Sequence, residues 1–286
     1  MSLWKQITRW VQDPPPEHIF ELSEAGIAYS RNGETGFQVF EPGVLVVSPT
    51  ADNLLQPNAV ASALARIAPP NGNKRRPAAI ILPDYAARVS LLDFDSFPSS
   101  PEEQLPLVRF RVKKTIPFDI DSAAVSYWAQ PASTKAGVKK VEVIAVTVAM
   151  EILARYEAIF RTANLYPGEV TTSGLAALSL YDADGIAVIA KLTGNVLTVM
   201  AIDHGQLKLF RCLTIENGSD EEILAVLNPT FAYIEDELGQ KPEKLLLCGF
   251  AKPLEGLNIE MEPLRSHLGT ANAYNAGLLG YLEGAA

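Results

Sequence analysis

The sequence has little of what a disulfide framework, a membrane span or a secretory signal requires. Its 286 residues include only two cysteines, Cys212 and Cys248. Each lies inside an apolar run where a small buried side chain fits, which disfavours a disulfide framework. No stretch of about 18 apolar residues occurs, and the N-terminus lacks the apolar core of a secretory signal. We therefore expect a protein of the cytoplasm.

Positive charge is also scarce. The chain has 24 Lys and Arg against 33 Asp and Glu, a formal net charge of -9. The basic runs Lys74-Arg75-Arg76 and Lys139-Lys140 are too short to form a phosphate-binding face and read as solvated loops. Because nucleic-acid affinity comes largely from Lys and Arg that neutralise phosphates, the composition argues against a nucleic-acid partner.

Catalytic and metal-binding motifs are absent as well. The sequence has no Walker segment and no Gly-x-Ser-x-Gly nucleophile turn. The three histidines, His18, His204 and His267, are scattered, with no spacing that suggests a metal site. We expect all three to be ordinary loop or surface residues, and we expect no metal site.

What the sequence does contain is enough apolar material for two lobes. With 48% hydrophobic and 20% charged residues it is a globular chain, long enough for one large or two medium domains. The first 16 residues differ from the rest. The apolar residues of this segment recur at helical spacing with Lys5 and Arg9 between them, and Pro14-Pro15-Pro16 ends the pattern. They are Leu3, Trp4, Ile7, Trp10 and Val11. This predicts an amphipathic helix on a proline hinge, which packs on the protein's own surface or contacts a membrane or partner.

The remaining chain repeats one order of elements. Three strands joined by short turns, then a helix, then a buried strand are predicted twice, about 170 residues apart. The first set is expected at 18–22, 26–30, 36–40, 57–68 and 78–83, and the second at 186–191, 196–202, 207–213, 219–238 and 244–248. We interpret this as a duplicated lobe, with the first lobe at 17–168, a small inserted α/β sub-lobe at about 90–145, and a shortened second lobe at 169–286. A helix at 151–163 ends at Tyr166-Pro167-Gly168.

Three stretches resemble the PilM family, the actin-like cytoplasmic proteins of type IV pilus assembly. They are Leu82-Pro83-Asp84-Tyr85-Ala86-Ala87-Arg88-Val89, the segment Arg109-Phe110-Arg111-Val112-Lys113-Lys114-Thr115-Ile116-Pro117-Phe118-Asp119-Ile120-Asp121, and Val143-Ile144-Ala145-Val146 with the helix that follows it. The resemblance covers most of the chain from about residue 17. It implies an α/β fold of the actin-like ATPase class, with two ribonuclease-H-like lobes and a nucleotide cleft between them.

The resemblance also implies a partner. Members of that family bind the N-terminal cytoplasmic tail of PilN, a bitopic inner-membrane protein. Pro117 ends the preceding helix, and the turn projects Phe118 sideways, where it either closes the core of the sub-lobe or lines a groove for a partner peptide. On this basis Ile116, Pro117 and Phe118, together with Trp4 and Trp10, are the candidate partner-binding residues.

The expected nucleotide cleft departs from an active site. Its candidate residues are Glu21, Ser23, Lys191, Thr193, Gly194 and Gly249. Glu24 puts negative charge where a phosphate would lie, the second lobe has Lys191 where a carboxylate is expected, and Phe250 replaces one glycine of the adenosine turn. The sequence therefore disfavours ATP and Mg²⁺ and predicts a vestigial cleft.

The expected function is a cytoplasmic scaffold, peripheral at the inner membrane, in a type IV pilus or related secretion complex. It would bind a PilN-like tail and other assembly proteins. Three alternatives stay open: an active ATPase of the same machinery, a platform domain of type II secretion similar to GspL, and a self-associating, filament-forming relative of actin.

Overall fold

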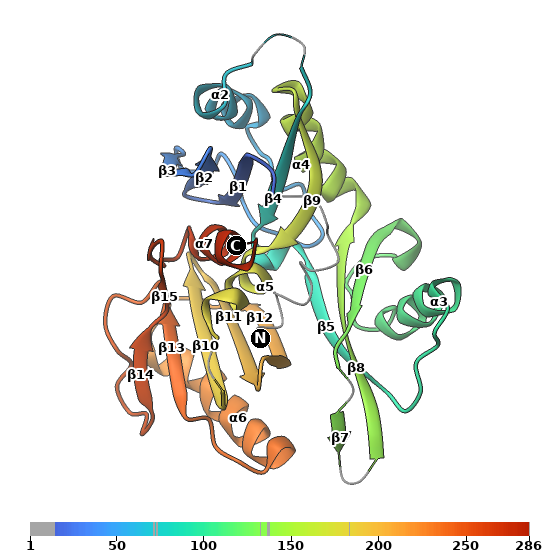
Figure 1. Cartoon of the computed structure of the whole chain (residues 1–286). Coiled ribbons are helices and arrows are strands. Elements are labelled where there is room, and N and C mark those ends of the chain that lie inside the picture. Colours follow the sequence, from blue (N-terminus) through green and yellow to red (C-terminus); the bar gives the residue numbers. More distant parts are fainter. Residues whose placement is uncertain are drawn as a thin grey trace.

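A computed structural model of the chain describes residues 15–285, apart from 71, 73, 132, 136, 137 and 183, with the backbone alone for 133–135, 138 and 139. The predicted helix that carries Trp4 and Trp10 lies outside these residues. Two five-stranded sheets form the centres of two lobes, and a smaller inserted sheet extends to one side (Figure 1).

The first sheet has the strand order β3-β2-β1-β4-β9. β1 pairs antiparallel with β2, and β2 with β3, whereas β4 is parallel to both β1 and β9. The helices α2 and α4 cover one face and enclose a core that includes Phe20, Tyr156 and Phe160. The bounds are β1 (His18–Ser23), β2 (Gly26–Arg31), β3 (Glu34–Val39), α2 (Pro57–Ile67), β4 (Arg76–Leu82), α4 (Met150–Thr162) and β9 (Leu165–Thr172).

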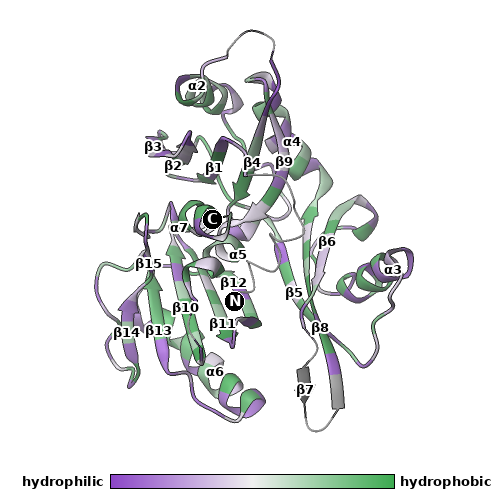
Figure 2. Cartoon of the chain, viewed as in Figure 1, coloured by the Kyte–Doolittle hydropathy of each residue, from purple (hydrophilic) through white to green (hydrophobic). Residues whose placement is uncertain are grey.

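The second sheet repeats this arrangement as β12-β11-β10-β13-β14. Its first two pairings are antiparallel and its last two parallel, as in the first lobe. The predicted duplication is therefore confirmed. α6 runs unbroken through Pro229 and covers this sheet with one helix, while β14 at the edge is hydrophilic (Figure 2). The bounds are β10 (Ile186–Thr193), β11 (Val196–Asp203), β12 (Gln206–Thr214), α6 (Asp220–Leu238), β13 (Lys244–Cys248) and β14 (Glu260–Pro263).

The strands that were not expected are β7 (Ser133–Lys135), β9, β14, β15 (Arg265–Ser266) and β16 (Gly269–Thr270), and β9 is the longest of them. Residues 166–168, read as the end of a helix, lie inside β9, and the expected lobe boundary at 168/169 divides that strand. The register with β4 shifts so that Ala78 pairs with Pro167 and Ala79 with Glu169, which leaves Gly168 as a bulge. A proline is tolerated here because β9 is an edge strand with a local break in the ladder. The first sheet thus extends to Thr172.

The inserted sub-lobe begins after β4 and returns to the first lobe at α4. Its sheet has the order β5-β8-β6, with β7 paired to β8. α3 packs on the outer face through Val108 and Val112. The bounds are η1 (Asp84–Ala86), β5 (Arg88–Phe94), α3 (Pro101–Val112), η2 (Ile120–Ser122), β6 (Ala123–Ala129), β7 (Ser133–Lys135) and β8 (Val138–Ala149).

This sub-lobe docks on the edge strand of the second lobe. The side-chain amide of Gln130 donates to the Leu207 carbonyl at 2.8 Å and accepts from the Leu207 N–H at 2.9 Å, as a neighbouring strand would. Beside it, the half-buried Lys208 ammonium lies 2.6 Å from the Glu142 carboxylate. The buried Gln130 hydrogen bonds and this part-buried ion pair hold the sub-lobe to the second lobe.

Two helices cross between the main sheets. α5 (Ser173–Ala177), continued by η3 (Leu178–Leu180), follows β9, and α7 (Ala276–Ala285) closes the chain after the short strands β15 (Arg265–Ser266) and β16 (Gly269–Thr270). A Cβ atom at Gly280 would lie 2.2 Å from the Ala176 carbonyl oxygen, and one at Gly277 would lie 2.8 Å from Ser173 Cα. Only glycine allows the two backbones to approach this closely.

His18 is not the loop residue that was expected. It begins β1 and is 5% exposed, and burial followed by the charge of Arg76 lowers the pKa of its imidazole, so it stays neutral near pH 7. The Arg76 guanidinium donates to the carbonyls of Ala68 and Ala163, the residues that end α2 and α4. A cation at these positions stabilises both helix C-termini.

No helix among the described residues has the length and apolar character to cross a membrane.

Candidate functional site

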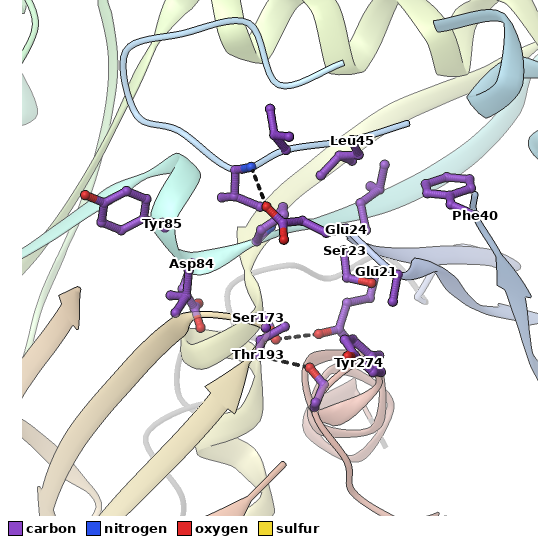
Figure 3. Close-up of a pocket in the computed structure, with 18 of the residues that line it drawn as sticks. Glu21, Ser23, Glu24, Phe40, Leu45, Asp84, Tyr85, Ser173, Thr193 and Tyr274 are labelled. Atoms are coloured by element: carbon purple, nitrogen blue, oxygen red, sulfur yellow. Dashed lines mark hydrogen bonds between the residues drawn. The ribbon is translucent and has the colours of Figure 1, made fainter. Parts of the chain in front are cut away.

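A cavity of about 370 Å³ lies between the two lobes (Figure 3). Its walls come from the β1–β2 turn, the loop 40–47, the Pro83-Asp84-Tyr85 segment, the end of β10 and the Ala273-Tyr274 segment before α7. Five of the six candidate cleft residues line it, namely Glu21, Ser23, Lys191, Thr193 and Gly194. Most of the wall is apolar, and charged groups gather on the floor.

Asp84 joins the two lobes on this floor. Its Oδ2 lies 3.2 Å from Lys191 Nζ in β10 and accepts a hydrogen bond from the Thr198 hydroxyl at 3.0 Å. Its Oδ1 accepts from the Gly174 N–H, in the first turn of α5, at 2.5 Å. The side chains of Lys191 and Asp84 are 3% and 1% exposed, so this ion pair is shielded from water.

Glu21 binds the start of α7 as Asp84 binds the start of α5. One carboxylate oxygen accepts a hydrogen bond from the Ser173 hydroxyl, and the other accepts from the Leu278 N–H, in the first turn of α7, at 2.7 Å. The positive end of the helix dipole favours a carboxylate there. Both oxygens of Glu21 are thus engaged inside the protein, and the side chain is 2% exposed.

The duplication makes Glu21 and Lys191 equivalent positions. In the first lobe the last pair of the β1–β2 hairpin is Ser23 with Gly26, and in the second it is Thr193 with Val196. Counting back from these pairs matches Glu21 with Lys191, and both residues adjoin the fourth strand of their sheets. The two equivalent positions therefore carry opposite charges.

Burial and these neighbours change the ionisation of both groups. Burial raises the pKa of the Glu21 carboxyl, and the Lys191 ammonium and the two hydrogen bonds offset this only in part. Burial alone would lower the pKa of Lys191, but the carboxylates of Asp84 and Glu21 outweigh it, so the pKa of Lys191 is raised. Lys191 is therefore charged at neutral pH and neutralised from within the protein.

The polar side chains of the turns at the mouth of the cavity also make hydrogen bonds within the protein. The Ser23 hydroxyl donates to the Gly26 carbonyl at 3.0 Å, and the Thr193 hydroxyl accepts from Lys191 and donates to the Ala273 carbonyl, both at 2.9 Å. Glu24 accepts from the Val47 N–H at 3.0 Å. A Cβ atom at Gly194 would lie 3.5 Å from the other carboxylate oxygen of Glu24. The Glu24 carboxylate therefore lies between the loop 40–47 and the β10–β11 turn that contains Gly194.

Gly249 and Phe250 take other positions than expected. Neither lines the cavity. Gly249 has φ +83° and lies so near β10 that a Cβ atom would be 2.1 Å from the Leu192 carbonyl oxygen. Phe250, which replaces one glycine of the expected adenosine turn, packs against the core under α6 that contains Leu247 and Leu254. Burial of apolar surface favours this position of the ring.

The candidate partner-binding residues of the sub-lobe are Ile116, Pro117 and Phe118, and none of them lines the cavity. Phe118 is half-buried and packs against both the sub-lobe core and the first-lobe core. Ile116 is half-buried against the sub-lobe core, and Pro117 is exposed. Phe118 thus has a packing role, and of the three residues Pro117 offers the most exposed surface.

Sequence reasoning missed Asp84, Ser173 and Thr198 as site residues. Asp84 was noted only as part of the resemblance, and the signal that singles it out is a charged residue two positions after a continuous apolar strand. Ser173 and Thr198 carried no such signal. Among the described residues no group of three or more His, Cys, Asp or Glu side chains is placed to hold a metal ion.

No protein-family model matches this sequence, and no curated protein matches it at a significant level. Solved structures do. A chain of the PilM–PilN type IV pilus biogenesis complex aligns over 96% of this chain and 100% of its own length, with a TM-score of 0.69 and 16% identity. The chain has the actin-like ATPase fold of PilM.

A second similar structure is the cytoplasmic domain of EpsL, an inner-membrane component of the type II secretion system of Vibrio cholerae. It aligns over 94% of this chain and 93% of its own length, with a TM-score of 0.56 and 13% identity. Together with the repeated sheet order, these alignments confirm the predicted fold class.

We predict a pH-dependent effect of Glu21→Gln. A carboxyl whose pKa is raised in the folded state binds more protons there than in the unfolded chain, so wild-type stability falls as the pH rises above the ordinary value of 4.5. Glutamine keeps an acceptor for Leu278 and a donor for Ser173 but does not titrate. The stability of the variant relative to wild type should therefore increase with pH, by at most about 1.4 kcal/mol per pH unit.

Urea unfolding between pH 4.5 and 8 measures this difference. Glu151→Gln, which removes an exposed carboxylate from α4, controls for the general effect of net charge. If the stability of Glu21→Gln relative to wild type stays constant or decreases as the pH rises, the raised pKa of Glu21 is contradicted.

Proposed function

We propose that this protein is a PilM-like cytoplasmic scaffold, peripheral at the inner membrane, in the assembly complex of a type IV pilus or related secretion system. It would bind the N-terminal cytoplasmic tail of a PilN-like bitopic membrane protein. The alignment with a chain of the PilM–PilN complex, nearly end to end on both chains, carries this proposal.

The floor of the cleft supports a scaffold over an ATPase. A Mg²⁺-nucleotide site needs free carboxylate oxygens for the ion and its waters, and free N–H groups for the phosphates. Here Glu21 and Asp84 already accept from N–H groups at the starts of α7 and α5, and Lys191 pairs with Asp84. Two like charges about 4 Å apart repel by about 4 kcal/mol at an effective dielectric of 20, so Glu24 disfavours a phosphate at the mouth. These residues do not fit Mg²⁺-ATP.

The similarity to the cytoplasmic domain of EpsL supports the wider statement, a platform component of pilus assembly or type II secretion. The sub-lobe, docked on the second lobe by Gln130 and Lys208, offers a rigid surface for a tail. The candidate surface is the segment of Ile116, Pro117 and Phe118, and Trp4 and Trp10 remain candidates for a second contact.

Tail binding tests the proposal directly. We expect at least one synthetic N-terminal tail, from a set taken from candidate bitopic membrane proteins, to bind the full chain in a fluorescence anisotropy titration. Pro117→Glu, at an exposed position, should weaken that binding about tenfold or more because it places a charge on the contact surface. Val39→Glu, on the exposed edge of β3, is the matched control. Failure of every tail to bind would remove the main support for a scaffold.

Nucleotide binding separates the scaffold from a working ATPase. We expect Mg²⁺-ATP at millimolar concentration to leave thermal stability unchanged. A ligand at a hundred times its dissociation constant would stabilise the fold by about 2.7 kcal/mol. Micromolar affinity in isothermal titration, or magnesium-dependent hydrolysis, would favour the ATPase instead. Sedimentation at high protein concentration tests the filament-forming alternative.

A further inference from the structure

The C-terminal half of α3 has an exposed aromatic ring among cations. Phe110 is 71% exposed, the largest exposed fraction among the large hydrophobic side chains of the described residues. Residues three and four positions apart are neighbours on a helix surface. The neighbours of Phe110 are therefore the exposed Pro106 on one side and the exposed Lys113 and Lys114, just beyond the helix, on the other.

Residues 109–114, at the C-terminal end of α3, are positively charged, although the chain as a whole is acidic. Arg109, Arg111, Lys113 and Lys114 supply four positive charges in six residues of a chain whose net charge is -9. Acidic side chains around this end are the exposed Asp93 and Asp95 at the end of β5 and the exposed Asp119 and Asp121 after the helix, while Glu102 and Glu103 lie two turns away at the other end. Within residues 109–114 themselves no acidic residue offsets the four cations.

The two arginines and the two lysines have different roles. Arg109 donates to the Ile120 carbonyl at 2.6 Å and lies 3.5 Å from Asp121, and Arg111 donates to the Asp93 carbonyl at 3.2 Å and stacks over Phe94. Both hold α3 to its sheet. No ion pair joins Lys113 or Lys114 to another described residue, so both ammonium groups are available to an external anion.

The position of α3 leaves this surface open. The helix packs on the outer face of the inserted sheet through Val108 and Val112, and it lies on the side of the sub-lobe opposite the second lobe (Figure 1). Phe110, Lys113 and Lys114 are all exposed on this helix end.

We propose that the C-terminal end of α3 is a contact site for an anionic lipid surface. At a membrane interface an aromatic ring enters the headgroup region, and each Lys or Arg near the surface attracts anionic lipid. Phe110 provides the apolar contact, and Lys113 and Lys114 pair with phosphate groups. The contact goes beyond the proposed tail binding and does not require it, since no tail residue takes part.

Vesicle co-sedimentation of the full chain tests this site. We expect the wild type to bind vesicles of equimolar phosphatidylglycerol and phosphatidylcholine, and to bind pure phosphatidylcholine vesicles much more weakly. Phe110→Gln should lower the partition coefficient about tenfold. Lys113→Gln with Lys114→Gln should lower it about 30-fold and reduce its dependence on salt.

Two matched variants control for apolar surface and for charge elsewhere. Val39→Gln removes a side chain that is 65% exposed on β3, and Lys74→Gln with Arg75→Gln removes two exposed cations from the loop before β4. Both should bind as the wild type does, and circular dichroism should show that all variants are folded. The proposal is overturned if the wild type fails to bind the anionic vesicles, or if the α3 variants bind them no more weakly than the controls.

Discussion

The buried ion pair between Lys191 and Asp84 is the interaction on which the two-lobed arrangement depends. Asp84 follows β4 of the first lobe and Lys191 lies in β10 of the second, so the pair spans the floor of the cleft. Removing one partner of such a pair leaves an uncompensated charge in the protein interior, which costs about 3–5 kcal/mol. Thr198, Thr193 and the Gly174 N–H complete the hydrogen bonds of the two groups. The lobes therefore cannot separate at this point without a large loss of stability.

The two lobes of the duplicated fold differ at one pair of equivalent positions on this floor. Glu21 and Lys191 occupy equivalent positions in the two lobes and carry opposite charges, and the Lys191 ammonium is paired with Asp84 inside the protein. Glu21 fixes α7 and Asp84 fixes α5, while Gly277 and Gly280 let the two helices cross in close contact. The docking of the sub-lobe on β12 through Gln130 adds a second link between the lobes. These contacts support the proposed scaffold over the alternative of a working ATPase.

Much of the fold was predictable because its signals are local. Hairpin turns such as Asn32-Gly33 and continuous apolar runs such as that of β4 gave both halves of the duplication, and the repeat in turn placed Glu21 and Lys191 at one site. β9 was missed because Pro167 and Gly168 usually end an element, whereas here they form a bulge on an edge strand. Asp84 was missed because its partner Lys191 is 107 residues away, and no local pattern encodes such a pairing. The packing of Phe250 was not predicted because only the tertiary structure shows which core the ring joins.

A double-mutant cycle between Lys191 and Asp84 tests the central claim most directly. Lys191→Met, Asp84→Asn and the double variant would be compared with the wild type by urea unfolding at pH 7. Each single variant should lose about 3–5 kcal/mol, and the double variant should lose about 1.5–3 kcal/mol less than the sum of the two, because the second change removes a charge that the first left unpaired. Strictly additive losses would contradict the account, since they would show that the two groups do not hold the lobes together as a pair.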